Sequence, residues 1–152
     1  AIILHHVSHR LHCSKKRHEG ILSPMRHIGI DYGSKRIGIA LSDEGGTLAF
    51  PEITLPNDKK AVGAIVALAR ERGADDIVVG EPLSLRGGEN PLMKRINSFI
   101  EALKRSGGTN IHLEKEFLTS DEARRHTASE HEDAAAAALI LQRYLDKRVK
   151  TS

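Results

Sequence analysis

The sequence of 152 residues has a single cysteine, no tryptophan, two tyrosines and three phenylalanines. The lone thiol, Cys13, can form neither an internal disulfide nor a cysteine-rich zinc site, which excludes disulfide-stapled scaffolds and most zinc modules. No apolar run approaches the ~18 residues of a membrane-spanning helix. We therefore expect one soluble domain with no membrane partner, located in the reducing cytoplasm.

An excess of positive charge is also lacking outside the N-terminal segment. The chain carries 23 basic and 20 acidic residues, a formal net charge of +3. Residues 1–24 hold four of the basic residues and one of the acidic ones, so residues 25–152 hold 19 of each. The excess charge is therefore no evidence that the main part of the chain binds nucleic acid.

Residues 1–24 differ from the rest in composition as well. They hold five of the nine histidines and show no regular hydrophobic period, and they lack the apolar core and cleavage site of a secretory signal. We interpret them as a flexible extension that precedes one domain over 25–148, followed by a frayed tail over 149–152 within the polar segment 146–152. The alternative is a His/Cys metal-binding tail, although its spacing matches no standard site.

From Met25 onward, short β-rich runs alternate with helical patterns. In chain order we expect strands at 27–31, 36–42 and 52–55, a helix from Asn57 to Gly73, a strand at 76–80, a helix from Asn90 to Gly107, a strand at 110–117, a short helix capped by Thr119 and Glu122, and a last helix capped by Ser129 and Glu132 over 134–145. This order predicts an α/β fold. Its mixed sheet of about five strands begins with an antiparallel hairpin, continues with parallel strands and has helices on both faces.

Three acidic residues stand at the ends of these elements. Asp31 ends an apolar strand, where a buried carboxylate without a partner would be strongly disfavoured, so its presence favours a functional role. Glu116 lies at the end of a later strand and is equally consistent with a solvated strand end. Asp133 precedes an apolar helix, and by itself it is also explained as an acid that complements the helix dipole.

Together the three acids suggest more than each does alone. Carboxylates gathered at one end of a mixed sheet form an all-oxygen site suited to Mg²⁺ or Mn²⁺. One or two such ions activate water and stabilise the leaving oxygen of a phosphoester. We therefore expect Asp31, Glu116 and Asp133 to be metal ligands and catalytic residues.

Four motifs, taken in order, resemble those of the YqgF/RuvX family of bacterial nucleases, which have a ribonuclease H-like fold. They are Asp31-Tyr-Gly with Lys-Arg-Ile-Gly-Ile-Ala-Leu-Ser-Asp from Lys35, Val79-Gly-Glu-Pro-Leu, Glu116-Phe-Leu-Thr-Ser, and Asp133-Ala-Ala ahead of Leu139-Ile-Leu-Gln-Arg-Tyr-Leu. The resemblance implies a metal-dependent hydrolase of phosphodiester bonds that matures the 5′ end of pre-16S rRNA during ribosome biogenesis. It implies Holliday junction resolution in DNA recombination and repair as the alternative, with Asp31, Glu116 and Asp133 as the catalytic acids.

The chain departs from the family pattern at two places. Glu81 stands where the family has an aliphatic or aromatic residue, and it is either an extra ligand or a solvated acid. Lys115 and Phe117 replace an acid and an arginine beside Glu116, so an arginine that would contact phosphate is missing. These changes keep open a catalytically silent module that binds nucleic acid.

Candidate nucleic-acid contacts are basic residues close in sequence to the proposed ligands or in a glycine-containing loop: Lys35, Arg36, Arg86, Arg124 and Arg125. Tyr32 and Phe117 are the candidates for base stacking, so recognition is expected to depend mainly on shape and backbone charge. A further rival is an actin-like nucleotide-binding domain, which shares the first motif but needs a second lobe. The substrate is therefore precursor rRNA or branched DNA, and the active form is a monomer or a homodimer.

Overall fold

The computed structural model describes residues 25–82, 90–107, 110–116 and 129–151 of the chain. The expectations for the extension 1–24 and for the short helix at Thr119 lie outside these residues. No helix in the described ranges is long and apolar enough to cross a membrane.

The centre of the fold is a five-stranded mixed sheet in the order β3-β2-β1-β4-β5. The strands are β1 (Arg26–Tyr32), β2 (Arg36–Ser42), β3 (Ala49–Pro56), β4 (Ala74–Pro82) and β5 (Asn110–Glu116). Strands β1, β2 and β3 pair antiparallel, whereas β1, β4 and β5 pair parallel. The expected topology of an antiparallel hairpin followed by parallel strands is confirmed.

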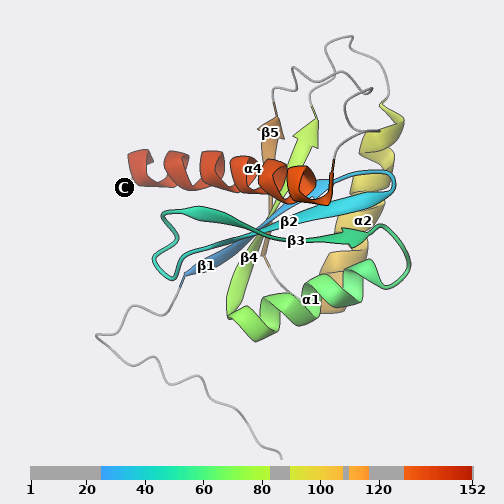
Figure 1. Ribbon diagram of the computed structural model, residues 1–152, viewed down its shortest axis with the longest axis horizontal. Coiled ribbons are helices and arrows are strands. Elements are labelled where there is room, and N and C mark those ends of the chain that lie inside the picture. Colours follow the sequence, from blue (N-terminus) through green and yellow to red (C-terminus); the bar gives the residue numbers. More distant parts are fainter. Residues whose placement is uncertain (1–24, 83–89, 108–109, 117–128, 152) are drawn as a thin grey trace, which may run out of the picture.

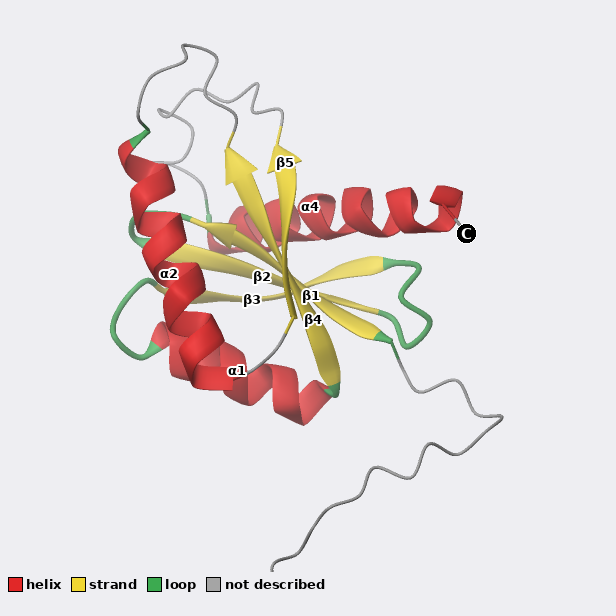
Figure 2. Ribbon diagram, turned by 180° about the vertical axis from the view of Figure 1, so that it is seen from behind, coloured by secondary structure: helices red, strands yellow, loops and turns green. Residues whose placement is uncertain are grey.

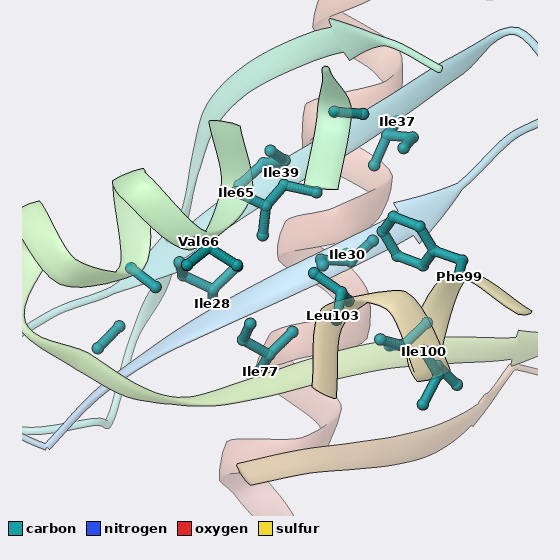
Figure 3. Packing of buried hydrophobic residues seen from close by; sticks show 14 of the residues in the cluster. Ile28, Ile30, Ile37, Ile39, Ile65, Val66, Ile77, Phe99, Ile100 and Leu103 are labelled. Atoms are coloured by element: carbon teal, nitrogen blue, oxygen red, sulfur yellow. The ribbon is translucent and has the colours of Figure 1, made fainter. Parts of the chain in front are cut away.

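Helices cover both faces of the sheet, as Figures 1 and 2 show. Helices α1 (Ala61–Arg72) and α2 (Pro91–Gly107) lie on one face, and α4 (Glu130–Thr151) crosses the other. Along β1, the alternate residues Ile28 and Ile30 point to the first of these faces and pack with α1 and α2 in the larger core (Figure 3). A smaller core joins Ala40 and Val78 to α4. Side-chain alternation therefore assigns each strand residue to one of two chemically distinct faces.

Two glycines allow α4 to approach the sheet at backbone distance. A Cβ at Gly29 would lie 2.6 Å from Cβ of Leu141, and a Cβ at Gly38 would lie 2.0 Å from the carbonyl oxygen of Asp133. No larger residue fits at Gly38 unless the helix moves, because the clash is with backbone atoms. The N-terminal turn of α4 is therefore seated directly on β2.

Most of the expected helix ends are confirmed. Asn90 Oδ1 accepts a hydrogen bond from the Leu92 amide (3.0 Å). Ser129 and Glu132 form a reciprocal capping box, with the Ser129 amide 2.7 Å from Glu132 Oε2. Gly73 ends α1 in the left-handed conformation, with φ of 65°.

Three expectations about element ends are wrong. Asn57 does not cap α1, whose N-cap is Lys60; the Asn57 side chain instead donates to the Gly33 carbonyl (2.7 Å). Strand β3 begins at Ala49, not Glu52, because residues 49–51 pair with β2. Helix α4 extends to Thr151, beyond the expected end of the last helix at Leu145, and Lys147 in this added part forms an ion pair with Glu114 of β5.

Candidate active site

Asp31 lies near the carboxyl end of β1, opposite Gly38 of β2 in the antiparallel register. It is half-buried. Gly29, two residues earlier, faces Ala137 and Leu141 of α4, so alternation places Asp31 on the α4 face as well. The carboxylate is therefore carried by a central strand that has hydrogen-bonded neighbours on both sides.

Asp133 lies in the first turn of α4. Gly38 links it to Asp31: the glycine is the strand partner of Asp31, and its α4-facing side meets the Asp133 carbonyl. Paired residues in an antiparallel sheet have Cα atoms ~5 Å apart. Because α4 packs directly on β2, two acids that are about 100 positions apart in sequence both lie next to Gly38.

The Asp133 carboxylate has a basic neighbour. Its Oδ2 lies 2.7 Å from Nε of Arg36, and the Asp133 side chain is 18% exposed. Despite this short ion pair, Oδ2 is buried and accepts no hydrogen bond from the described residues. Arg36, predicted to contact phosphate, therefore holds the Asp133 carboxylate beside β2.

Glu116 is the last residue of β5, and its Cα is in register with that of Pro82 in β4. Strand β5 is separated from β1 by β4, so its backbone lies about 10 Å from that of β1. In the described ranges, no group of three or more His, Cys, Asp or Glu side chains is placed to hold one metal ion. The structure therefore brings Asp31 and Asp133 together and gives only the backbone position of Glu116.

The other predicted site residues have different placements. Lys35 is exposed in the β1–β2 turn, where its carbonyl accepts a hydrogen bond from the Asn57 amide (2.9 Å). Glu81 follows Val79, a residue of the α1/α2 core, by two positions, so it points away from the α4 face on which Asp31 lies. This favours a solvated acid over an extra ligand. Arg86, Arg124, Arg125 and Phe117 lie outside the described residues.

Sequence reasoning missed a second polar cluster on the α4 face, at the opposite end of the sheet. His27 is 1% exposed, and its Nε2 lies 2.6 Å from Nη1 of Arg148 and 3.4 Å from Oδ2 of Asp76. Asp76 Oδ1 lies 3.0 Å from Nε2 of His112. The sequence does hold a signal for this cluster: a polar residue stands near the start of each of the three parallel strands, namely His27 in β1, Asp76 in β4 and His112 in β5.

The pKa values of His27 and Asp76 are both lowered, and in each case burial acts against the neighbouring groups. Burial lowers the pKa of His27, and the Asp76 carboxylate offsets this only in part. Burial alone would raise the pKa of Asp76, but hydrogen bonds from His112 and Asn110 outweigh it and lower that pKa below its usual value. The cluster therefore stabilises a neutral imidazole beside an ionised carboxylate.

The sequence matches one family model and several named relatives. A family model described as "RuvX: Holliday junction resolvase" matches residues 25–147. A protein of Opitutus terrae named "Putative pre-16S rRNA nuclease" is 38% identical over 135 residues, which cover 82% of this chain and 93% of the relative. A protein of Dehalococcoides mccartyi with the same name is 40% identical over 124 residues, covering 76% of this chain and 93% of the relative.

Solved structures give the fold. Thermus thermophilus RuvC in complex with a Holliday junction substrate superposes with a TM-score of 0.54 at 15% identity, covering 82% of this chain and 96% of that one. A second structure of Thermus thermophilus RuvC gives a TM-score of 0.51 at 16% identity, covering 84% of this chain and 98% of that one. The expected ribonuclease H-like fold is thereby confirmed.

Proposed function

The chain belongs to the RuvX family, and from that premise we propose that it is a nuclease that cleaves phosphodiester bonds of precursor 16S rRNA in the cytoplasm. The observation that carries the proposal is the convergence of Asp31 and Asp133 across Gly38, on one face of the sheet. Relatives named as pre-16S rRNA nucleases match over most of their length, which supports the substrate.

We propose that the two carboxylates bind one or two Mg²⁺ or Mn²⁺ ions. The donors fit such an ion because both are hard oxygen ligands, and the buried Oδ2 of Asp133 accepts no hydrogen bond from the described residues. Glu116 completes the proposed ligand set on the grounds of sequence. When bound, the metal supplies an activated water and charge stabilisation at the phosphate.

The chain itself contributes position. Asp31 is fixed by a strand paired on both sides, and Asp133 is fixed by the seating of α4 on Gly38 and by Arg36. Because these carboxylates are already in position, they need little rearrangement when substrate binds, and this preorganisation lowers the activation barrier. Lys35, exposed in the adjacent turn, is proposed to neutralise a phosphate flanking the cleaved one.

Holliday junction cleavage is the second candidate, favoured by the description of the matching family model. Such an enzyme would act as a symmetric dimer that makes two related cuts, whereas processing of one RNA end needs a single site. Each substrate therefore carries its own expectation for the oligomeric state: a dimer for the junction and a single site for the RNA.

The test compares a precursor 16S rRNA fragment and a four-way DNA junction side by side in Mn²⁺, with EDTA as the metal-free control. We expect cleavage of the RNA that stops in EDTA and in Asp31→Asn protein. Cleavage of the junction alone would replace the RNA assignment with the resolvase one. Binding of RNA without any metal-dependent cleavage would favour the silent module, and ATP hydrolysis independent of nucleic acid would favour the actin-like rival.

A further inference from the structure

A pocket of about 400 Å³ lies on the α1/α2 face at the carboxyl end of β1, on the other side of the sheet from Asp133. Its walls include Tyr32 from β1, Val62 from α1 and Phe99 from α2, and its rim carries Asp58, Lys94 and Arg95. We call this open depression the Tyr32 pocket. It is wide open to solvent, so a group bound there would stay partly exposed.

The inner wall of the Tyr32 pocket is aromatic and fixed. The rings of Tyr32 and Phe99 lie with centroids 4.9 Å apart and planes tilted by 48°. Phe99 is only 7% exposed and belongs to the main core, where Figure 3 shows it beside Ile30 and Ile37. Tyr32 remains half-buried and lines the cavity. A planar, partly apolar group can therefore pack on a preformed surface.

The rim adds positive charge. Lys94 and Arg95 are both exposed on α2, and they line the pocket together with Asp58. Asp58 Oδ1 accepts a hydrogen bond from the Lys60 amide (2.8 Å). A ligand with a planar ring and a negative charge matches both the wall and the rim, and a nucleotide has both.

The pocket is tied to the proposed active site by covalent and hydrogen-bonded links. Tyr32 follows Asp31 directly, so their Cα atoms are ~3.8 Å apart while their side chains point to opposite faces. Asn57, which lines the pocket, bonds to the carbonyls of Gly33 (2.7 Å) and Lys35 (2.9 Å) in the β1–β2 turn. Both figures place that turn, α2 and the start of α4 at one end of the molecule (Figures 1 and 2).

We propose that the Tyr32 pocket binds one unpaired nucleotide next to the phosphodiester that is cut, with its base against Tyr32 and its phosphate at Lys94 and Arg95. A base held in this way cannot also be paired in a duplex. The inference rests on the proposed function and refines its substrate to a single-stranded segment at the cleavage point.

The test measures binding by fluorescence anisotropy in EDTA, where no cleavage occurs, with a short single-stranded RNA and a blunt RNA duplex as probes. The variant is Lys94→Ala/Arg95→Ala. The matched control is Lys104→Ala/Arg105→Ala, which removes the same two residue types from exposed positions at the other end of α2. For the single strand, each lost phosphate contact reduces the slope of log affinity against log salt by about 0.7.

We expect the Lys94/Arg95 variant to lose about 0.7 to 1.4 of that slope for single-stranded RNA, with little change for the duplex and none in the control variant. Tyr32→Leu is expected to weaken single-strand binding about tenfold, whereas Tyr32→Phe retains it. Equal effects of the two double variants, or equal losses for duplex and single strand, would overturn the inference.

The outcomes also separate this inference from the proposed function. If the wild type cleaves RNA in Mn²⁺ but the two double variants bind alike, the pocket assignment alone is wrong. If the variants behave as expected while no metal-dependent cleavage occurs, nucleotide binding in the pocket stands, its position beside a cut bond does not, and the nuclease proposal fails. Tight binding of inorganic phosphate or free nucleotide in place of RNA would also overturn the assignment to a strand.

Discussion

At the scale of single residues, the ion pair between Arg36 and Asp133 places a positive charge where the proposed metal ion needs a ligand. Arg36 holds the carboxylate in position, but it also competes electrostatically with a cation for Oδ2. Removing a positive charge near a half-exposed cation site is worth on the order of 1 kcal/mol. Metal affinity and carboxylate position are therefore balanced against each other at this residue.

Arg36→Gln is accordingly expected to lower the Mn²⁺ concentration that half-saturates the protein several-fold, because the competing charge is removed. The measurement is a Mn²⁺ titration followed by electron paramagnetic resonance of the free ion. Arg72→Gln, which breaks the ion pair with Glu52 on another part of the sheet, is the control. An unchanged or higher Mn²⁺ requirement in Arg36→Gln would show that Arg36 does not oppose the ion.

Sequence reasoning singled out Asp31 and Asp133 as candidates but did not predict that Arg36 pairs with Asp133. Asp31 was found because a carboxylate at the end of an apolar strand is unusual, a signal carried by local sequence. The partner of Asp133 depends on where α4 crosses β2, which is a property of tertiary packing. Arg36 was therefore expected at a phosphate, and its contact with Asp133 became visible only in three dimensions.

The buried His27 gives stability a predicted pH dependence. Its pKa in the folded state is lowered from 6.5, so between the folded value and 6.5 the unfolded chain binds a proton that the folded chain does not. The effect of His27 on the free energy of unfolding is therefore absent above pH 6.5. As the pH is lowered through that value, His27 reduces the free energy of unfolding by up to about 1.4 kcal/mol per pH unit. Asp76 stays ionised in this window, because its pKa is also lowered.

Urea unfolding as a function of pH measures this effect. His27→Gln should flatten the decline of the unfolding free energy below pH 6.5, whatever its effect on absolute stability. His131→Gln, at an exposed position of α4, should leave the decline unchanged. Identical pH profiles for the wild type and His27→Gln would rule out this role for the buried imidazole.

At the scale of elements, the seating of α4 on the sheet depends on Gly38. A methyl group there would meet the Asp133 backbone at 2.0 Å, whereas a methyl group at Gly63 of α1 meets nothing within 4 Å. The two glycines thus provide opposite tests of the same substitution. One is required by close packing, and the other only lowers helix propensity.

Gly38→Ala is expected to destabilise the protein by about 2–3 kcal/mol or more, since the helix backbone must move. Gly63→Ala should stabilise it by about 0.5–1 kcal/mol through the lower entropy of the unfolded chain. Chemical denaturation of both variants tests the pair. A Gly38→Ala protein as stable as the wild type would contradict the close approach of α4 to β2.

Element types followed from hydrophobic period, and several ends followed from capping residues such as Asn90 and Ser129. Asn57 misled this reasoning because its side chain satisfies a carbonyl in a distant turn instead of an amide in its own helix. The length of α4 was underestimated because its last turns are polar. Their side chains reach sheet residues such as Glu114 and His27, contacts that local sequence does not encode.

At the scale of the whole molecule, the excess positive charge and the proposed catalytic residues belong to different parts of the chain. Residues 1–24 account for the net charge of +3, while the family match begins at residue 25. Removing residues 1–24 is expected to bring the formal net charge to zero and leave Mn²⁺-dependent RNA cleavage within about twofold. A steep loss of cleavage by the shortened protein would assign a role in catalysis or binding to that segment.

The central claim is that Asp31 and Asp133, joined through Gly38, form a metal-dependent nuclease centre. The most direct measurement is the single-turnover rate of RNA cleavage in Mn²⁺ by the wild type and by Asp31→Asn, with RNA affinity measured in EDTA. The account predicts a loss of at least about a thousandfold in rate for Asp31→Asn, because a metal-binding carboxylate is removed, with RNA affinity unchanged. A rate within tenfold of the wild type would contradict it.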